Sequence, residues 1–102
     1  NFEQQRWKKY FIHGLSHWLG LDVHDVGRYK DADNQPVKLE PGMVITVEPG
    51  IYILRESGAD ERWRGIGIRI EDDLVITEDG FQNMTASVPK TVEEIEAWMQ
   101  KL

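Results

Sequence analysis

Three histidines and two aspartates lie within thirteen residues near the beginning of the sequence: His13, His17, Asp22, His24 and Asp25. The chain has no other histidine. Imidazole is the commonest metal ligand in proteins and the side chain best suited to moving protons near neutral pH. The cluster therefore indicates a chemical role, either metal binding or proton transfer.

Two isolated acids, Glu48 and Glu71, occur in otherwise apolar segments that have the composition of strands. A carboxylate is costly in such surroundings unless it is paired or bound to a metal ion. Taken singly, each acid is typical of a solvated strand residue and each histidine of a hydrogen-bonded structural residue. Together, in a chain without cysteine, they favour a hard divalent ion held by nitrogen and oxygen, manganese before zinc.

Length and composition limit the kinds of partner and the cellular location that the sequence allows. At 102 residues, the chain is one domain or part of one. A formal net charge of −6 argues against nucleic acid and anionic membranes as partners, because both require a basic surface. No apolar run approaches the roughly 18 residues that span a bilayer. The absence of cysteine is compatible with the cytoplasm, which is the location that we predict.

Hydrophobic periodicity and turn residues predict a chain made mainly of strands. The expected elements are an irregular lead-in or helix end over residues 1–11, a loop over 27–42, strands over 43–48 and 51–54, a loop over 55–64, strands over 65–71 and 74–77, a turn over 78–80 and a helix over 91–101. At the start of the predicted helix, Thr91 and Glu94 have the spacing of a capping box.

The segment 65–71 alternates strictly, so we expect it to present two different faces. The face that we expect to lie in the core consists of Ile66, Ile68 and Ile70. The opposite face consists of Gly65, Gly67, Arg69 and Glu71. The two glycines leave room for a group to lie against the backbone, next to one cation and one anion. The alternative is an ordinary half-exposed strand with a polar outer face.

The histidine segment has two patterns. His13 and His17 have the i, i+4 spacing that places two side chains on one face of a helical turn, although Gly14 and Gly20 disfavour a long helix. Over residues 19–24, apolar and polar residues alternate, which is typical of a short strand.

Three segments, 13–27, 39–52 and 65–73, together closely resemble the C-terminal part of bacterial aminopeptidase P, the Xaa-Pro aminopeptidase family. The motifs occur in the family's order, and the likeness extends from Phe11 to the last helix. The resemblance implies an α+β fold, the second half of a pita-bread (creatinase/aminopeptidase) domain with mainly antiparallel strands and a C-terminal helix. It implies that residues 1–102 are the C-terminal portion of one catalytic domain, with no complete second domain.

The same resemblance implies the roles of individual residues. In that family, two manganese ions are held by two aspartates, one histidine and two glutamates. The resemblance makes His17 the histidine ligand, Glu48 the terminal glutamate and Glu71 the glutamate that bridges both ions. It implies that His13 and His24 line the substrate pocket and stabilise charge during the reaction. It also places Tyr52 against the substrate and Arg69 behind the ligands as a catalytic residue.

The two aspartate ligands of the family precede the first histidine, and residues 1–12 contain no aspartate. The other aspartates lie at the wrong places in the pattern. Since the first residue is Asn, we expect a piece of a longer polypeptide whose missing N-terminal half is its partner. We expect this piece to be inactive alone, to bind at most one manganese ion weakly, and to form homo-oligomers through uncovered strands.

For the complete protein, the resemblance implies release of the N-terminal residue from peptides with proline in second position. Two metal ions would activate a water molecule and stabilise the oxyanion formed at the scissile bond. One alternative is a prolidase-type dipeptidase, which uses the same types of ligand. Another is a non-catalytic pita-bread module that binds peptides or proteins. Retention of His17, Glu48 and Glu71 argues against the second alternative.

Overall fold

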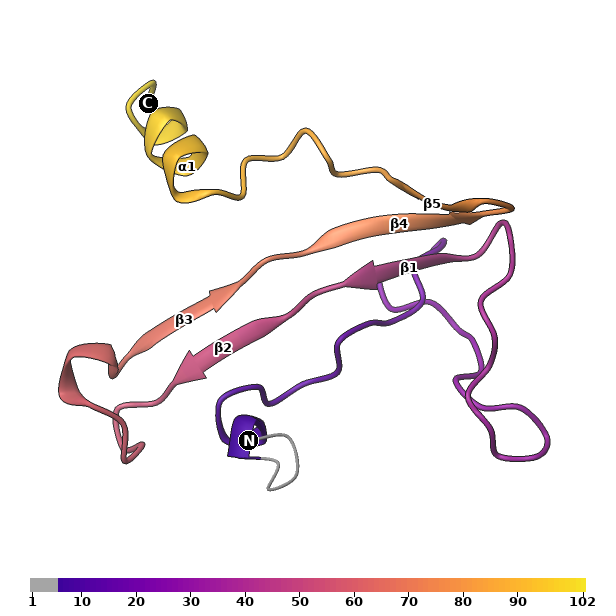
Figure 1. The fold of residues 1–102 in the computed structure, drawn as a ribbon, viewed down its shortest axis with the longest axis horizontal. Helices are drawn as coiled ribbons and strands as arrows, with labels where there is room; N and C mark the ends of the chain where they lie inside the picture. The colour runs from indigo at the N-terminus through magenta and orange to yellow at the C-terminus, as the bar shows by residue number, and fades with distance from the viewer. Residues whose placement is uncertain (1–5) are drawn as a thin grey trace.

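The computed structural model describes residues 6–102, so the first five residues of the predicted lead-in lie outside it. Its elements are the 3-10 helix η1 (Arg6–Lys9), the strands β1 (Val44–Val47) and β2 (Gly50–Ile53), the 3-10 helix η2 (Glu61–Trp63), the strands β3 (Ile66–Arg69), β4 (Asp72–Thr77) and β5 (Gly80–Asn83), and the helix α1 (Val92–Met99). The strands form one long antiparallel ribbon, and α1 follows at the end of an irregular segment (Figure 1).

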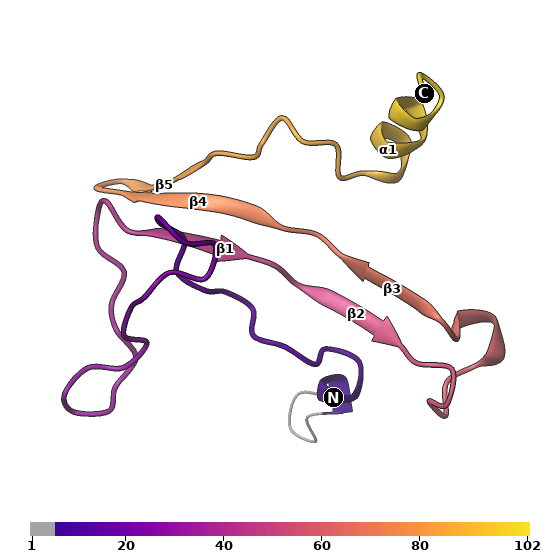
Figure 2. The same ribbon diagram turned by 180° about the vertical axis from the view of Figure 1, so that it is seen from behind.

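The ribbon has two consecutive ladders that share one register. β1 pairs with β4, and β2 pairs with β3, while β5 extends the first sheet beyond β4. The strands break at Pro49, because proline has no N–H to donate. Across the break, the carbonyl of Pro49 accepts a hydrogen bond of 3.2 Å from the N–H of Ile70. The ribbon therefore runs through the interruption, as the reverse view also shows (Figure 2).

An extended segment over residues 15–19 lies antiparallel along the free edge of β1. The N–H of Thr46 donates to the carbonyl of His17 at 3.0 Å, and the N–H of Glu48 donates to the carbonyl of Leu15 at 2.8 Å. Trp18 forms an antiparallel bridge with Ile45. The pairing fixes His17 beside Thr46 of β1 and Glu48 in an extended conformation, without a helical turn.

The short strand expected over residues 19–24 is wrong. This segment is a series of bends, in which the N–H of Gly20 bonds to the carbonyl of Asp22 at 3.2 Å. The N–H of Asp25 then returns to the carbonyl of Trp18 at 3.1 Å. Local bonds satisfy these backbone groups, so the segment turns back instead of continuing along β1.

Most other expected elements are confirmed. The turn after Glu40 closes with an N–H to carbonyl bond from Met43 to Glu40 of 3.1 Å, and Gly42 has a φ of 91° that favours glycine. The capping box of Thr91 and Glu94 is formed, although α1 ends earlier than expected, at Met99. The sequence did not predict β5 or the 3-10 helix η2 within the loop 55–64.

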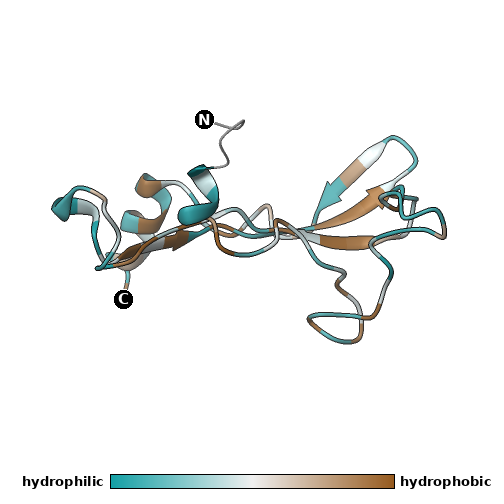
Figure 3. Cartoon of the chain, turned by 90° about the horizontal axis from the view of Figure 1, so that it is seen from below, coloured by the Kyte–Doolittle hydropathy of each residue, from teal (hydrophilic) through white to brown (hydrophobic). Residues whose placement is uncertain are grey.

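The expected isoleucine core is also wrong. Ile66, Ile68 and Ile70 are 41 %, 61 % and 42 % exposed, and no hydrophobic side chain among the described residues is buried. Apolar stretches lie along the strands in Figure 3. The radius of gyration is 17.0 Å, whereas a compact domain of this length has about 13 Å. The isoleucines are exposed because nothing within residues 6–102 covers their face.

Candidate metal centre

Three side chains converge at the break in the ribbon. His17, Glu48 and Glu71 each offer one ligand atom, and these atoms lie within 4.8 Å of one another. Because Val47 pairs with Asp72 in the register that both ladders share, Glu48 and Glu71 occupy opposite positions and point to the same face. The long-range pairing of strands therefore creates the site.

His17 is held in an orientation suited to a metal ligand. Its Nδ1 lies 2.9 Å from the carbonyl oxygen of Trp18, which only accepts hydrogen bonds, so Nδ1 carries the hydrogen. In the neutral ring, Nε2 then has a free lone pair, and it lies 3.0 Å from Oε1 of Glu48. A carbonyl that fixes the tautomer in this way is a common companion of metal-binding histidines.

Glu48 is a buried carboxylate with several polar partners. It is 7 % exposed, and Thr46 beside it is 1 % exposed. The Thr46 hydroxyl donates to Oε1 of Glu48 at 3.0 Å and accepts from the N–H of His17 at 3.1 Å. Burial acts to raise the pKa of Glu48, but the hydrogen bonds from Arg69 and Thr46, together with the charge of His17 when its ring is protonated and the charge of Arg69, outweigh it and hold the pKa below its usual range.

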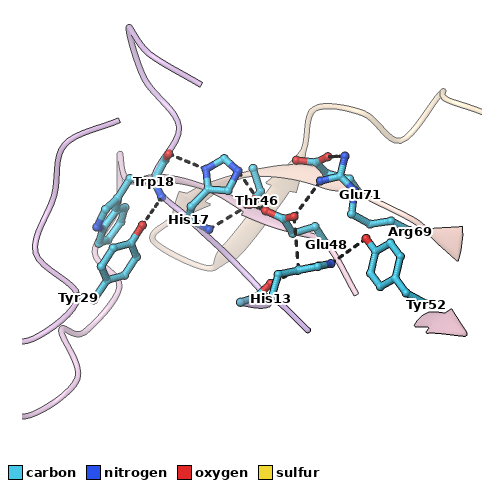
Figure 4. Close-up of polar contacts among 10 residues, drawn as sticks. His13, His17, Trp18, Tyr29, Thr46, Glu48, Tyr52, Arg69 and Glu71 are labelled. Atoms are coloured by element: carbon cyan, nitrogen blue, oxygen red, sulfur yellow. Dashed lines mark hydrogen bonds and ion pairs between the residues drawn. The ribbon is translucent and has the colours of Figure 1, made fainter. Parts of the chain in front are cut away.

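Arg69 bridges the two glutamates. Its Nη1 lies 2.8 Å from Oε2 of Glu48, and its Nη2 lies 3.0 Å from Oε2 of Glu71 (Figure 4). Like charges at opposite positions of a ladder repel, so the guanidinium stabilises the pair. The hydrogen bond to Glu48 and the charge of Glu71 raise the pKa of Arg69. One oxygen of each glutamate faces Arg69, and Oε1 of Glu48 faces His17.

The other predicted site residues lie around this cluster. The hydroxyl of Tyr52 is 2.9 Å from Nε2 of His13, and Nδ1 of His13 is 3.9 Å from Oε2 of Glu48. The exposed His24 ring lies edge-on to the ring of His17, with centroids 4.2 Å apart. All seven predicted residues are therefore at or beside one site.

The donor set fits a divalent cation. An imidazole nitrogen and two carboxylates converge, one carboxylate is buried, and the nitrogen's lone pair faces it. Such nitrogen and oxygen donors suit manganese and zinc. No aspartate among the described residues joins this group of ligands.

The sequence model of metallopeptidase family M24 matches residues 2–78. The chain belongs to this family. It is 62 % identical over 96 residues to the Xaa-Pro aminopeptidase of Escherichia coli and 56 % identical over 97 residues to that of Haemophilus influenzae. The matches cover 94 % and 95 % of this chain but 21 % and 22 % of those proteins. This M24 chain thus spans about one fifth of the length of the curated relatives it matches.

A solved structure shares the fold. The structure of E. coli aminopeptidase P with the inhibitor Pro-Leu aligns with a TM-score of 0.89 and 59 % sequence identity, over 98 % of this chain and 22 % of that one. The predicted pita-bread architecture, with antiparallel strands and a C-terminal helix, is confirmed. Membership of M24 also implies a divalent metal ion. The domain boundaries and the roles of individual residues stay predictions.

Sequence patterns did not identify one polar residue of the candidate metal centre. Thr46 links the backbone of His17 to the carboxylate of Glu48, and it is the most deeply buried side chain described. Its signal was present, because Thr46 is two residues before Glu48 and therefore shares its face of the strand. Strand alternation alone does not show that a segment distant in sequence, residues 15–19, pairs with β1 beside Thr46.

Proposed function

We propose that the polypeptide containing this chain is a metal-dependent aminopeptidase that releases the N-terminal residue from peptides with proline in second position. The convergence of His17, Glu48 and Glu71 carries this proposal. The activity named for relatives 62 % and 56 % identical to this chain supports it. Manganese is the proposed metal, because carboxylates outnumber imidazoles among the ligands and no thiolate is available.

The proposed reaction assigns roles to six residues of the site. When bound, the metal would polarise the attacking water and the developing oxyanion. His17, Glu48 and Glu71 would supply its ligands, and Arg69 bridges the two carboxylates and orients them. His13 and His24 flank this cluster as residues of the substrate pocket, and His24, whose ring is exposed, would donate a hydrogen bond to the carbonyl of the scissile imide.

The proposal extends to the parts of the protein beyond this chain. Two aspartates from the rest of the polypeptide would complete a two-manganese centre. We propose that this piece alone is inactive, holds at most one ion weakly, and associates with copies of itself. The cytoplasmic location and the absence of nucleic-acid and membrane partners stay predictions. Among the described residues, no helix is long and apolar enough to cross a membrane.

A comparison of substrates tests the activity. The metal-free full-length polypeptide should regain hydrolysis of an Xaa-Pro-Yaa tripeptide when manganese is added. It should cleave the matching Xaa-Ala-Yaa peptide much more slowly. Faster cleavage of the Xaa-Pro dipeptide than of the tripeptide would favour a prolidase. Binding of the tripeptide without any cleavage would favour a non-catalytic module and overturn the proposal.

A further inference from the structure

The ring of Tyr52 lies over two glycines on the same face as the metal centre. Gly67 is the paired residue of Tyr52 on the neighbouring strand, and Gly50 is two positions before Tyr52 on β2. In an antiparallel ladder, both positions present side chains to the face that carries Tyr52. A side chain at either position would therefore meet the tyrosine ring.

The contacts show how little space remains. A Cβ added at Gly50 would lie 2.8 Å from the hydroxyl oxygen of Tyr52, 2.9 Å from its Cε2 and 3.0 Å from Nε2 of His13. A Cβ at Gly67 would lie 3.2 Å from Cδ1 of Tyr52. Contacts below about 3.4 Å are tighter than ordinary van der Waals contact between carbon atoms. Gly50 is the tighter of the two positions.

Backbone conformation does not explain these glycines. The described glycines with positive φ are at other positions, Gly42, Gly65 and Gly80. Glycine in a strand weakens the strand, because it loses more conformational freedom on folding and has no side chain to pack. Glycine is required at Gly50 and Gly67 because the Tyr52 ring lies too close for a side chain at either position.

In this position, the hydroxyl of Tyr52 contacts His13. Nδ1 of His13 lies 2.7 Å from the carbonyl oxygen of Gly14 and therefore carries the hydrogen in the neutral ring. Nε2 then accepts a hydrogen bond of 2.9 Å from the hydroxyl of Tyr52. The ring of Phe11 packs edge-on against the same imidazole, with centroids 5.1 Å apart. His13 thus has a partner at both nitrogens.

We propose that Gly50 and Gly67 are positioning residues that seat the ring of Tyr52, and that Tyr52 thereby fixes the orientation of His13 through the hydrogen bond to its Nε2. Their effect on turnover rests on the proposed function, whereas their effect on the His13 ring does not. Gly50→Ala should displace the tyrosine hydroxyl from Nε2 of His13. Gly67→Ala should do so less, because the added contact is longer.

Four variants of the full-length polypeptide test this proposal: Gly50→Ala, Gly67→Ala, Tyr52→Phe and the control Gly58→Ala. Gly58 is suitable because an added Cβ there would meet only Nζ of Lys9, at an ordinary 3.7 Å. Tyr52→Phe keeps the ring and removes the hydroxyl, so it tests the same contact if Gly50→Ala fails to fold. The readouts are the ¹⁵N shifts of the His13 imidazole in zinc-loaded protein, the metal content and kcat/KM.

We expect the Gly58→Ala protein to match the wild type. In Gly50→Ala and Tyr52→Phe, the ¹⁵N shift of Nε2 of His13 should change because this nitrogen loses its hydrogen-bond donor, while metal content is retained. kcat/KM on an Xaa-Pro tripeptide should fall about three- to tenfold, as the loss of one net hydrogen bond implies. Unchanged His13 shifts in both variants would overturn the proposal. Absence of Xaa-Pro cleavage in the wild type would refute the proposed function, while the shifts would still decide the role of the glycines.

Discussion

At the residue scale, Glu48 shows how the site is prepared before any ligand binds. Three different segments supply its partners: His17 from the edge segment, Thr46 from β1 and Arg69 from β3. Because the pKa of Glu48 is lowered, the carboxylate stays ionised to a lower pH than an ordinary glutamate. A cation arriving at this site therefore meets a charged and already oriented ligand.

Replacing Thr46 by valine should destabilise the site with little change of shape. Thr46→Val leaves the N–H of His17 without its side-chain acceptor and removes a donor to Glu48. The free energy of unfolding of the full-length polypeptide should fall by about 1–3 kcal/mol, and metal affinity should fall with it. Denaturant titration measures the first quantity. The control is Thr77→Val at the exposed end of β4, and equal stability of the two variants would contradict the role of Thr46.

His24 should behave as a substrate-facing group. Its ring is exposed beside His17, and it is not in the group of converging ligand atoms. His24→Ala should therefore lower kcat on the order of 100-fold, the effect of removing an oxyanion donor, while manganese content stays at the wild-type value. Steady-state kinetics with metal analysis of the same sample measures both. Loss of metal together with activity would make His24 a ligand.

At the element scale, a hydrogen-bonded clamp holds the segment after β5 against β4. Nζ of Lys90 donates to the carbonyls of Thr85 and Val88 and lies 3.0 Å from Oδ1 of Asp72. The hydroxyl of Thr85 donates to the same carboxylate oxygen at 2.8 Å. Asp72 follows Glu71 directly, so this clamp fixes the strand next to a proposed metal ligand.

The clamp makes stability depend on pH. Hydrogen bonds from Thr85 and Asn83 and the contact with Lys90 lower the pKa of Asp72 in the folded state. The resulting stability is present above the unfolded value, about 3.9, and is lost as the pH falls through the lower folded value. The wild type should be more stable than Asp72→Asn at pH 6, and the difference should shrink as the pH falls below about 3.9. Thermal unfolding at several pH values measures this difference, and a constant difference would contradict the clamp.

The sequence predicted local features better than pairings between distant segments. Alternation and turn residues predicted the strands around Glu48 and Glu71, and the capping box predicted the start of α1. Neither pattern gives the register that puts those two glutamates opposite each other, because register depends on contacts between distant segments. The bend after His17 was mistaken for a strand, since alternation over six residues also occurs in turns.

At the scale of the whole molecule, the two faces of the ribbon differ in whether their side chains find partners within the described residues. The polar face carries the candidate metal centre, whereas the isoleucines of the other face are exposed. The expectation of an isoleucine core was wrong because burial depends on what packs against a strand as well as on its alternation. Exposed apolar strands with free edges tend to associate.

Chain 1–102 prepared alone should therefore associate through this face. Ile68 is 61 % exposed on β3, and Ile68→Lys should raise the dissociation constant of the assembly about ten- to hundredfold, the effect of losing one buried apolar side chain. The control is Val26→Lys, which changes an exposed residue of a distant loop. Sedimentation at low micromolar concentration measures the association. A compact wild-type monomer, or equal effects of both variants, would contradict this interpretation.

The most direct test of the metal centre is metal binding by Glu71→Gln in the full-length polypeptide. The amide lacks the charge of the carboxylate that faces Glu48 across the ladder. We expect affinity for manganese and Xaa-Pro hydrolysis to fall at least about 100-fold, since changes to groups behind metal ligands already cost 10- to 100-fold. Glu78→Gln, in the exposed turn after β4, should match the wild type in isothermal titration and in activity. Wild-type manganese affinity and turnover in Glu71→Gln would contradict the assignment of His17, Glu48 and Glu71 as the metal site.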